Sequence, residues 1–285
     1  MTDSPIQHVS DTARWVAVYR AMESERPDAV FHDPYARRLA GQHGETIVRG
    51  MKDGVKWAWP MVIRTAVMDE IILRLAGQGL DLVVNLAAGL DARPWRLALP
   101  PALRWVDVDF PDMLDYKTRT LAGERPVCVY EPRPADLANA AERRAVLAAA
   151  ASGARAGLVI TEGLLVYLDE AQVAALGRDA HAQPGLRWWL TDLASPGLKA
   201  FLDKSWGHQL ARGNAPMKFF PPQSTGFFEP LGWREIEWRE TWDEGRRLNR
   251  RMKLAWLFDI LQKLQSRRKR EAMKKFAGIA LLQRI

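Results

Sequence analysis

The segment Asp81–Arg93, DLVVNLAAGLDAR, places the strongest constraint on the fold of this chain. Leu82–Leu86 is a short apolar run with two adjacent valines, which is typical of a buried parallel strand. Small residues fill positions 87–89, Asp91 can accept a hydrogen bond from the start of a following helix, and Pro94 is tolerated in its first turn. A strand, a small-residue turn and a helix start bring the backbone close to a nucleotide-like ligand in doubly wound folds. Because AxAGxD is not GxGxxG, an ordinary turn without a ligand is an equally good interpretation of these residues alone.

A second strand that ends in acids strengthens the ligand-binding interpretation. Trp105–Phe110 reads WVDVDF, and Asp109 stands about twenty residues after Gly89. At that distance an acidic side chain can reach the hydroxyls of a bound ribose. Asp109 is a better candidate than Asp107, because it lies nearer the carboxyl end of the strand, where open α/β sheets bind ligands. Two solvated acids on an edge strand are the alternative.

The composition limits the class of protein. With 285 residues, 48% of them hydrophobic, the chain can bury one sizeable core, with or without an added cap. The sequence predicts no membrane span, because no run of eighteen apolar residues occurs, and its N-terminus lacks the pattern of a secretory signal. Cys128 is the only cysteine, which excludes an internal disulfide and fits a reducing cytoplasm.

Positive charge is concentrated near the C-terminus. Residues 246–275 contain twelve Lys or Arg against Asp259 and Glu271, so this segment carries +10 and the rest of the chain about −3 of the net +7. Such a stripe can bind nucleic acid or an anionic surface. A solvated helix face is the favoured interpretation, because no aromatic residues interleave the cluster at 267–270 to stack on bases.

Several motifs occur in an order that resembles one known family. They are DTARWVAVYRAMESERPDAVFHDPYARRLAG, the Arg64-Thr65 pair, NLAAGLDARPWRL, VDVDFPDMLDYKTRTL, the Asp136-Leu137 pair and TEGLLVYLDEAQV. Over roughly residues 10–192 the chain is similar to the S-adenosylmethionine-dependent O-methyltransferases of the leucine carboxyl methyltransferase type, which include bacterial enzymes that methylate polyketide acids. The resemblance is specific to the family and not to a substrate.

Alternating strands and helices predict an α/β fold with a doubly wound, mostly parallel sheet. The resemblance implies the seven-stranded, Rossmann-like sheet of the class I methyltransferases. The expected organisation is a helical cap at 1–76, a cofactor-binding core at 77–194, an irregular substrate-pocket insertion at 195–230 and a C-terminal part at 231–285 that completes the sheet. Strands are predicted at 82–86, 104–109, 127–130, 157–162, 187–192, 235–238 and 276–284. Helices are predicted at 12–25, 33–39, 61–75, 92–98, 111–122, 138–151, 169–182, 198–211 and 244–272.

The resemblance also implies which residues bind S-adenosylmethionine and its product, S-adenosylhomocysteine. The ligand's α-carboxylate suits a guanidinium fork, for which Arg64 is the first candidate and Arg14 the second. Glu162 is expected near the methionine part, where it could hold the α-amine. The remaining expected contacts are the turn at Ala87 and Gly89, the ribose acid Asp109, and the adenine neighbours Asp136 and Leu137. Asp136 could equally serve only as a helix cap.

Catalytic residues are not predicted firmly. Tyr167 is interpreted mainly as a core residue that could otherwise contact the substrate. His208 is interpreted mainly as a surface or structural residue that could otherwise act as a base. In the resembled reaction an oxygen attacks the methyl group of a sulfonium, and a carboxylate nucleophile would need no base.

The predicted function is cytoplasmic O-methylation of a small, apolar, aromatic or polyketide-like secondary metabolite. Methylation of a protein's C-terminal carboxylate, a nicotinamide-dependent dehydrogenase and a nucleic-acid-binding protein are the alternatives, the last not favoured. The sequence has no cluster typical of a metal site, and no feature that sets an oligomeric state.

Overall fold

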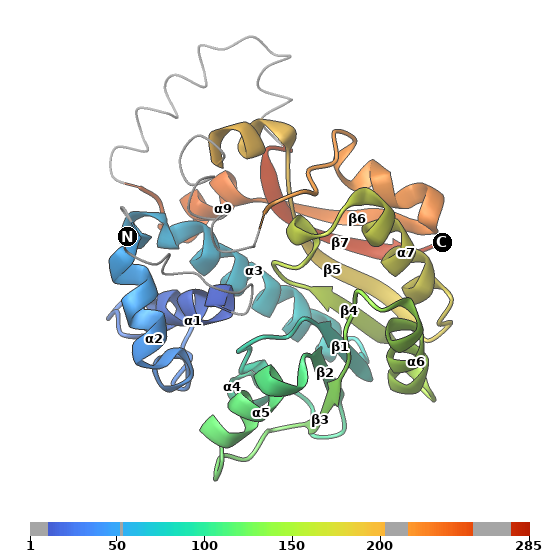
Figure 1. The fold of residues 1–285 in the computed structure, drawn as a ribbon, viewed down its shortest axis with the longest axis horizontal. Coiled ribbons are helices and arrows are strands. Elements are labelled where there is room, and N and C mark those ends of the chain that lie inside the picture. The colour runs from blue at the N-terminus through green and yellow to red at the C-terminus, as the bar shows by residue number, and fades with distance from the viewer. Residues whose placement is uncertain (1–10, 52–53, 203–215, 253–274) are drawn as a thin grey trace.

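A single seven-stranded sheet organises the chain in a computed structural model that describes residues 11–51, 54–202, 216–252 and 275–285 (Figure 1). Its strand order is β3-β2-β1-β4-β5-β7-β6. Strands β1 to β5 run parallel, whereas β7 is antiparallel to both β5 and β6. The C-terminal strand β7 therefore lies between β5 and β6. The strands are β1 Leu82–Leu86, β2 Arg104–Asp109, β3 Val129–Pro134, β4 Gly157–Thr161, β5 Leu186–Ala194, β6 Trp233–Glu240 and β7 Ala277–Arg284. The predicted doubly wound, mostly parallel sheet is confirmed.

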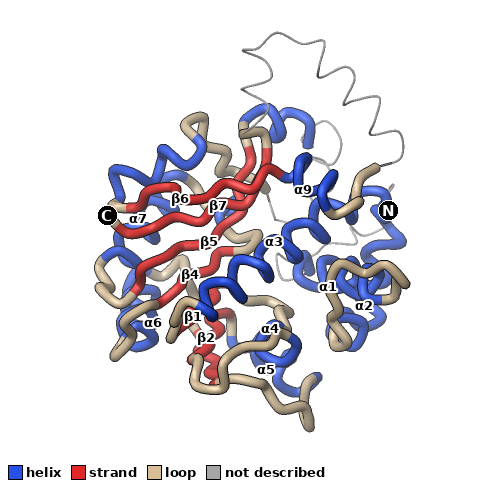
Figure 2. Tube along the Cα trace, turned by 180° about the vertical axis from the view of Figure 1, so that it is seen from behind, coloured by secondary structure: helices blue, strands red, loops and turns tan. Residues whose placement is uncertain are grey.

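Helices cover both faces of the sheet (Figures 1 and 2). On one face, α6 (Ala140–Ala151) and α7 (Glu170–His181) pack against Val84, Val106 and Val159. On the other face, the apolar side of α3 (Ala58–Gly77) packs against strand side chains that point to that face, among them Val83 and Leu158. Helix α9 (Thr241–Arg247) lies beside α3. Burial on both sides explains why the central strands β1 and β4 are mostly apolar.

The N-terminal helices lie beside the carboxyl ends of β1 and β2. Helices α1 (Asp11–Ser24) and α2 (Ala36–Gly50) form one apolar cluster with Leu90, Trp95 and Met113. These three residues lie around the short helix α4 (Arg93–Arg96) and in α5 (Pro111–Thr120). The helix predicted at 33–39 begins later and continues further, as α2, with a break at Gly41, whose φ is 61°. A short 3-10 helix, Gly54–Trp57, leads into α3.

The predicted third strand at 127–130 was misplaced, because β3 spans Val129–Pro134. Pro132 and Pro134 do not stop it, since β3 lies at the edge of the sheet and pairs only with β2. A proline lacks a backbone donor, and an edge strand tolerates that loss.

The predicted helix at 244–272 was wrong in its first part. Helix α9 begins earlier, at Thr241, and ends at Arg247. Asn249 adopts a left-handed φ of 53°, and the amides of Asn249 and Arg250 donate to the carbonyls of Arg246 and Gly245. This pattern is a Schellman helix end, in which asparagine can replace glycine. Residues 253–274, which hold most of the basic stripe, lie outside the described residues.

The predicted insertion contains two helical pieces among its described residues. Residues 196–202 are helical, and a 3-10 helix at Ser224–Leu231 precedes β6. His208 lies outside the described residues. Within the part of the chain that is described, no helix combines the length and the apolar character needed to cross a lipid bilayer.

Candidate functional site

A cavity of about 400 Å³ opens at the carboxyl ends of β1, β2, β4 and β5, beside α1. This is where open α/β sheets bind ligands. Its volume falls in the range of small-molecule sites. Nearly all of the predicted cofactor-binding residues line it, namely Arg64, Ala87, Gly89, Asp109, Asp136, Leu137 and Glu162. The structure therefore brings together residues that are up to 98 positions apart in the chain.

The turn after β1 and the acid at the end of β2 face the same space. Gly89 N donates to Asp109 Oδ2 at 2.7 Å, and Phe110 N donates to Oδ1 at 2.7 Å. Burial raises the pKa of the Asp109 carboxyl, although both backbone amides act in the opposite direction. Asp91 accepts from Arg93 N at 2.9 Å, as predicted for the helix start. A carboxylate that is oriented by two amides still has lone pairs to accept from a ligand.

The turn itself contains a non-glycine residue in a left-handed conformation. Ala87 has a φ of 52°, and Gly89 has a φ of 51°. For an L-residue this conformation costs about 1–2 kcal/mol, whereas glycine adopts it freely. The chain thus keeps some backbone strain at the point closest to the predicted ligand.

Replacing Ala87 with glycine is expected to raise the free energy of unfolding by about 0.5–1 kcal/mol, because the relieved strain exceeds the added chain entropy. Ala88, whose φ is not positive, provides the matched control. Ala88→Gly is expected to destabilise by about 1 kcal/mol. Urea denaturation of the two variants checks both values. Equal destabilisation of both would show that Ala87 is not strained.

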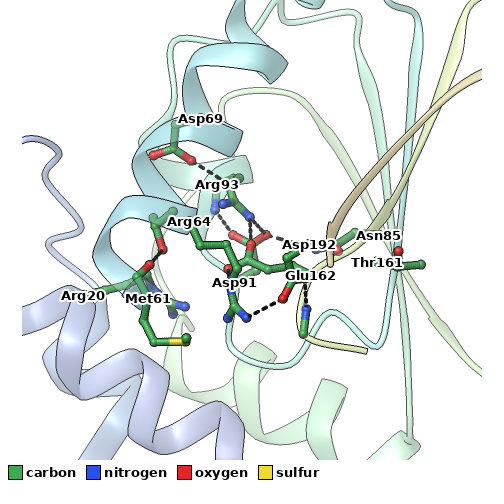
Figure 3. A network of polar contacts seen from close by, with 12 residues as sticks. Arg20, Met61, Arg64, Asp69, Asn85, Asp91, Arg93, Thr161, Glu162 and Asp192 are labelled. Atoms are coloured by element: carbon green, nitrogen blue, oxygen red, sulfur yellow. Dashed lines mark hydrogen bonds and ion pairs between the residues drawn. The ribbon is translucent and has the colours of Figure 1, made fainter. Parts of the chain in front are cut away.

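Buried ion pairs connect several of the residues that line the cavity (Figure 3). Arg64 Nε donates to Glu162 Oε1 at 3.0 Å, and its Nη1 donates to Asp192 Oδ2 at 3.2 Å. Arg93, which is 1% exposed, contacts Glu162 Oε2 at 2.7 Å, Asp91 Oδ2 at 2.6 Å and, through Nε, Asp69 Oδ1 at 2.6 Å. Glu162 is therefore held by two arginines from two different elements.

The same network continues into the N-terminal helices. Asp69 also accepts from Arg96, whose Nε lies 3.7 Å from Asp33 Oδ2. Asp33 accepts from Arg20 Nε at 2.9 Å, and Arg20 Nη2 donates to the carbonyl of Leu90 at 2.6 Å. Among the described residues, the connected groups are four arginines (20, 64, 93 and 96) and five carboxylates (33, 69, 91, 162 and 192). This described part of the network carries one excess negative charge.

Mutual attraction keeps these groups ionised. Burial alone would raise the pKa of Glu162, but Arg93 and Arg64 hold that pKa below its usual value. Burial likewise opposes the charged form of Asp91, and Arg93 is the main reason that the pKa of Asp91 is lowered. The pKa of Arg93 is raised well above its usual value by Asp91, Glu162 and Asp69 despite the desolvation of its guanidinium.

The guanidinium of Arg64 packs against Gly163. Its φ is +66°, and a Cβ at this position would lie 3.0 Å from Arg64 Nη1. Gly163→Ala is therefore expected to displace the guanidinium and to cost about 1–3 kcal/mol of stability. Gly77, which has open space around its Cα, is the control, and Gly77→Ala should change the melting temperature little. Thermal unfolding of both variants tests this, and equal melting temperatures would show that Gly163 is not constrained.

The predicted adenine neighbours follow β3, whereas Arg64 contacts residues after β4 and in β5, so strands β2 and β1 separate the two places in the sheet. Asp136 is half-buried and accepts from Ala138 N at 2.9 Å. The helix that follows is capped by Asn139, whose side chain accepts from Ala141 N and Glu142 N. Asp136 thus orders the turn before α6 without capping the helix, and both Asp136 and Leu137 line the cavity.

An apolar wall borders the rest of the cavity. It consists mainly of Trp15, Val16, Met61, Leu165, Val166, Leu198, Leu202, Met217, Phe219 and Phe220. Tyr167 also lines it, with its hydroxyl bonded to Thr12 and its pKa raised by burial. Among the described residues, no histidine borders the cavity and no group of metal ligands occurs.

Two residues considered as candidates from the sequence, Arg14 and Asp107, do not line the cavity. Arg14 stacks on the ring of Tyr116, 4.0 Å from its centroid, and is not among the residues that line the cavity. Asp107 is fully buried beneath the site, where it accepts from Lys117, Trp105 and Asn85.

No role for Arg20, Arg93 or Asp192 was predicted from the sequence. Arg93 and Arg20 are buried in the ion-pair network, and Asp192 lines the cavity. The only available signals were the position of Arg93 two residues after Asp91 and that of Asp192 near the carboxyl end of a predicted strand.

Comparison with known proteins assigns the chain to a family. The family model "Leucine carboxyl methyltransferase" matches residues 13–180, and the chain belongs to this family. A protein of Mycolicibacterium gilvum, named "Putative S-adenosyl-L-methionine-dependent methyltransferase", is 37% identical over 185 residues, covering 58% of this chain and 60% of that protein. A similarly named protein of Frankia alni is 32% identical over 238 residues, covering 78% and 81%. The cofactor predicted from the sequence, S-adenosylmethionine, is confirmed for the family.

Solved structures support the fold. A DUF574 family protein from Streptomyces avermitilis has a TM-score of 0.62 at 14% identity, covering 99% of both chains. A methyltransferase, also named as putative, from Thermobifida fusca has a TM-score of 0.60 at 13% identity, covering 99% of this chain and 96% of that one. These confirm the class I methyltransferase fold. The chain spans 60% and 62% of the lengths of the matched relatives from M. gilvum and Streptomyces coelicolor.

Proposed function

We propose that the chain is an S-adenosylmethionine-dependent O-methyltransferase acting on a carboxylate or acidic hydroxyl of a small, apolar, aromatic or polyketide-like molecule. The observation that supports this most is the common cavity of the Ala87–Gly89 turn and Asp109, which are joined by the 2.7 Å bond from Gly89 N. Family membership supports the methyl-transfer chemistry. The single buried cysteine fits the cytoplasmic location expected from the sequence.

The residues around the cavity fit both ends of the cofactor. At one end Asp109 would accept from ribose hydroxyls, and Asp136 and Leu137, which also line the cavity, would border the adenine. At the other end Arg64 would bind the α-carboxylate and Glu162 the α-amine. The excess of one carboxylate in the ion-pair network suits a ligand that brings an ammonium group.

Positioning and exclusion of water are the chain's expected contributions to the reaction. When bound, S-adenosylmethionine supplies an electrophilic methyl group on a positively charged sulfur. The apolar wall formed by residues such as Trp15, Leu165 and Phe219 would hold the acceptor oxygen in a dry space. No histidine borders the cavity among the described residues, which favours an acceptor that is already ionised at neutral pH.

The alternatives differ in their support. Methylation of a protein C-terminal carboxylate is compatible with the family and differs from the main proposal only in the acceptor. The family assignment removes the support for a nicotinamide-dependent dehydrogenase. A nucleic-acid-binding role for the basic stripe is disfavoured in its described part, because Arg247 pairs with Glu70 and Arg250 with Glu23.

Calorimetric titration with S-adenosylhomocysteine and with NAD tests the proposed class, and the expected result is binding of the first only. Transfer of labelled methyl groups to aromatic carboxylic acids, phenols and peptides with free C-termini then tests the acceptor. Binding of NAD without binding of S-adenosylhomocysteine would overturn the proposal. Transfer only to peptide carboxylates would favour the alternative acceptor.

A further inference from the structure

We propose that Asp192 is a positioning residue of the methyl-donor site, which acts by holding the guanidinium of Arg64 against the turn at Gly163. This inference rests on the proposed function and deepens it, because it assigns a task to a residue near the end of β5 that the site otherwise leaves without one. Asp192 lines the cavity, and its side chain is 27% exposed.

The two carboxylate oxygens of Asp192 have different partners. Oδ1 accepts from Gly163 N at 2.6 Å, and Oδ2 accepts from Arg64 Nη1 at 3.2 Å. Gly163 follows β4 with a φ of +66°, and a Cβ at this position would lie only 3.0 Å from Arg64 Nη1. One side chain therefore connects three elements: β5, the turn after β4, and α3.

Arg64 needs such a holder because of its length and its burial. A free arginine side chain has many rotamers, and ordering it at the moment of ligand binding would reduce the affinity. Here Glu162 fixes Nε and Asp192 fixes Nη1, so the plane of the guanidinium is set before a ligand arrives. A carboxylate ligand is recognised by the planar fork of an arginine, and its affinity depends on that orientation.

If Asp192 had a purely structural role, its replacement would weaken the binding of every ligand of the cavity to the same extent. If Asp192 acts by positioning Arg64, its replacement should weaken the binding only of ligands that carry the amino-acid part. Two probes separate these cases: S-adenosylhomocysteine, and 5′-methylthioadenosine, which keeps the nucleoside and the sulfur but lacks the amino-acid part.

The experiment is calorimetric titration of the full chain and its variants with both probes. Asp192→Asn keeps an acceptor for Gly163 N and removes the charge that faces Arg64. It is expected to lower the affinity for S-adenosylhomocysteine about tenfold, because one charge-assisted hydrogen bond is lost. The affinity for 5′-methylthioadenosine should stay within about twofold of the wild-type value. In an Arg64→Lys background, which lacks the fork, the same change should add less than about twofold, because the two residues act as a unit.

The matched control is Asp81→Asn, the same chemical change directly before β1, at the amino ends of the parallel strands and away from the cavity. Asp81 also accepts from backbone amides, those of Arg155 at 2.9 Å and Ala156 at 3.0 Å. This variant should bind both probes like the wild type. If Asp192→Asn lowers the affinity for both probes equally, or for neither probe, Asp192 is not a positioning residue, and the proposed function still stands. If the wild-type chain does not bind S-adenosylhomocysteine, both fail.

Discussion

Replacing Arg93 with methionine is expected to lower the free energy of unfolding by about 3–5 kcal/mol, because removal of one partner leaves buried charges uncompensated. Among the ion pairs of the described residues, Arg93 is the one residue that contacts Asp69, Asp91 and Glu162 together. Urea denaturation at pH 7 measures the loss. Arg37, an exposed arginine that pairs with Glu25 at 2.8 Å, is the control, and Arg37→Met should cost less than about 1 kcal/mol.

The loss in Arg93→Met should depend on pH in a defined direction. In the wild type the folded-state pKa values of Asp91 and Glu162 lie below 3.8 and 4.5, their usual values. Their contribution to stability is thus present above those values and is lost as the pH falls through the lowered ones. Without Arg93 burial raises both pKa values, so the variant gains protons as the pH falls from 7 towards 4. Its deficit should shrink over that range. A deficit that does not change between pH 7 and pH 4, or one below about 1 kcal/mol, would contradict this account.

Replacing Asp109 with alanine is expected to weaken the binding of S-adenosylhomocysteine by about 100-fold, equivalent to two hydrogen bonds to a charged group. The change removes the acceptor for the ribose and also frees Gly89 N, so the turn loses its alignment. Calorimetry measures the affinity. Asp112→Ala, at an exposed position three residues further on, is the control and should bind normally. Unchanged affinity in Asp109→Ala would remove this residue from the site.

The affinity of the wild type should also fall on acidification. Burial raises the pKa of Asp109 above its usual value of 3.8, so this carboxyl takes up a proton earlier than an exposed one as the pH decreases. The protonated form has a weaker acceptor for a ribose hydroxyl. Titrations between pH 7.5 and pH 4.5 check this, with 5′-methylthioadenosine as the probe because it does not depend on the amino-acid end. An affinity that does not change in this range would show that the ionised form of Asp109 is not required.

The local parts of the site could be predicted from the sequence. The run of apolar residues 82–86, the small residues after it and the spacing to Asp109 each reflect short-range rules of strand and turn formation. The resemblance to a family added Arg64, Glu162 and the pair at 136–137, all of which line the cavity. These residues are identified by short motifs that can be read without knowledge of the tertiary structure.

The ion-pair network could not be predicted in the same way. Arg93 bonds to Asp69 and Glu162, which lie 24 and 69 positions away, and nothing in the local pattern marks an arginine as buried. For the same reason Arg250, counted in the basic stripe, was expected to be solvated. It is 7% exposed and bonded to Glu23, 227 positions away. Charged residues are predicted to be exposed unless a partner is known, and the partners come from tertiary structure.

The misplaced boundaries have local causes that depend on context. The prolines at 132 and 134 indicate the end of a strand, except that β3 is an edge strand. Asn249 marks the end of α9, but asparagine is a weaker signal than glycine for a helix end, and the basic run beyond it suggested a continuing helix.

A crystal structure of the chain with S-adenosylhomocysteine tests the central claim most directly. The account predicts the ribose hydroxyls within hydrogen-bonding distance of Asp109, with the amino-acid part extending past the turn at 87–89 towards Arg64 and Glu162. A nucleoside bound on another surface, or in this cavity with its ribose directed away from Asp109, would contradict it.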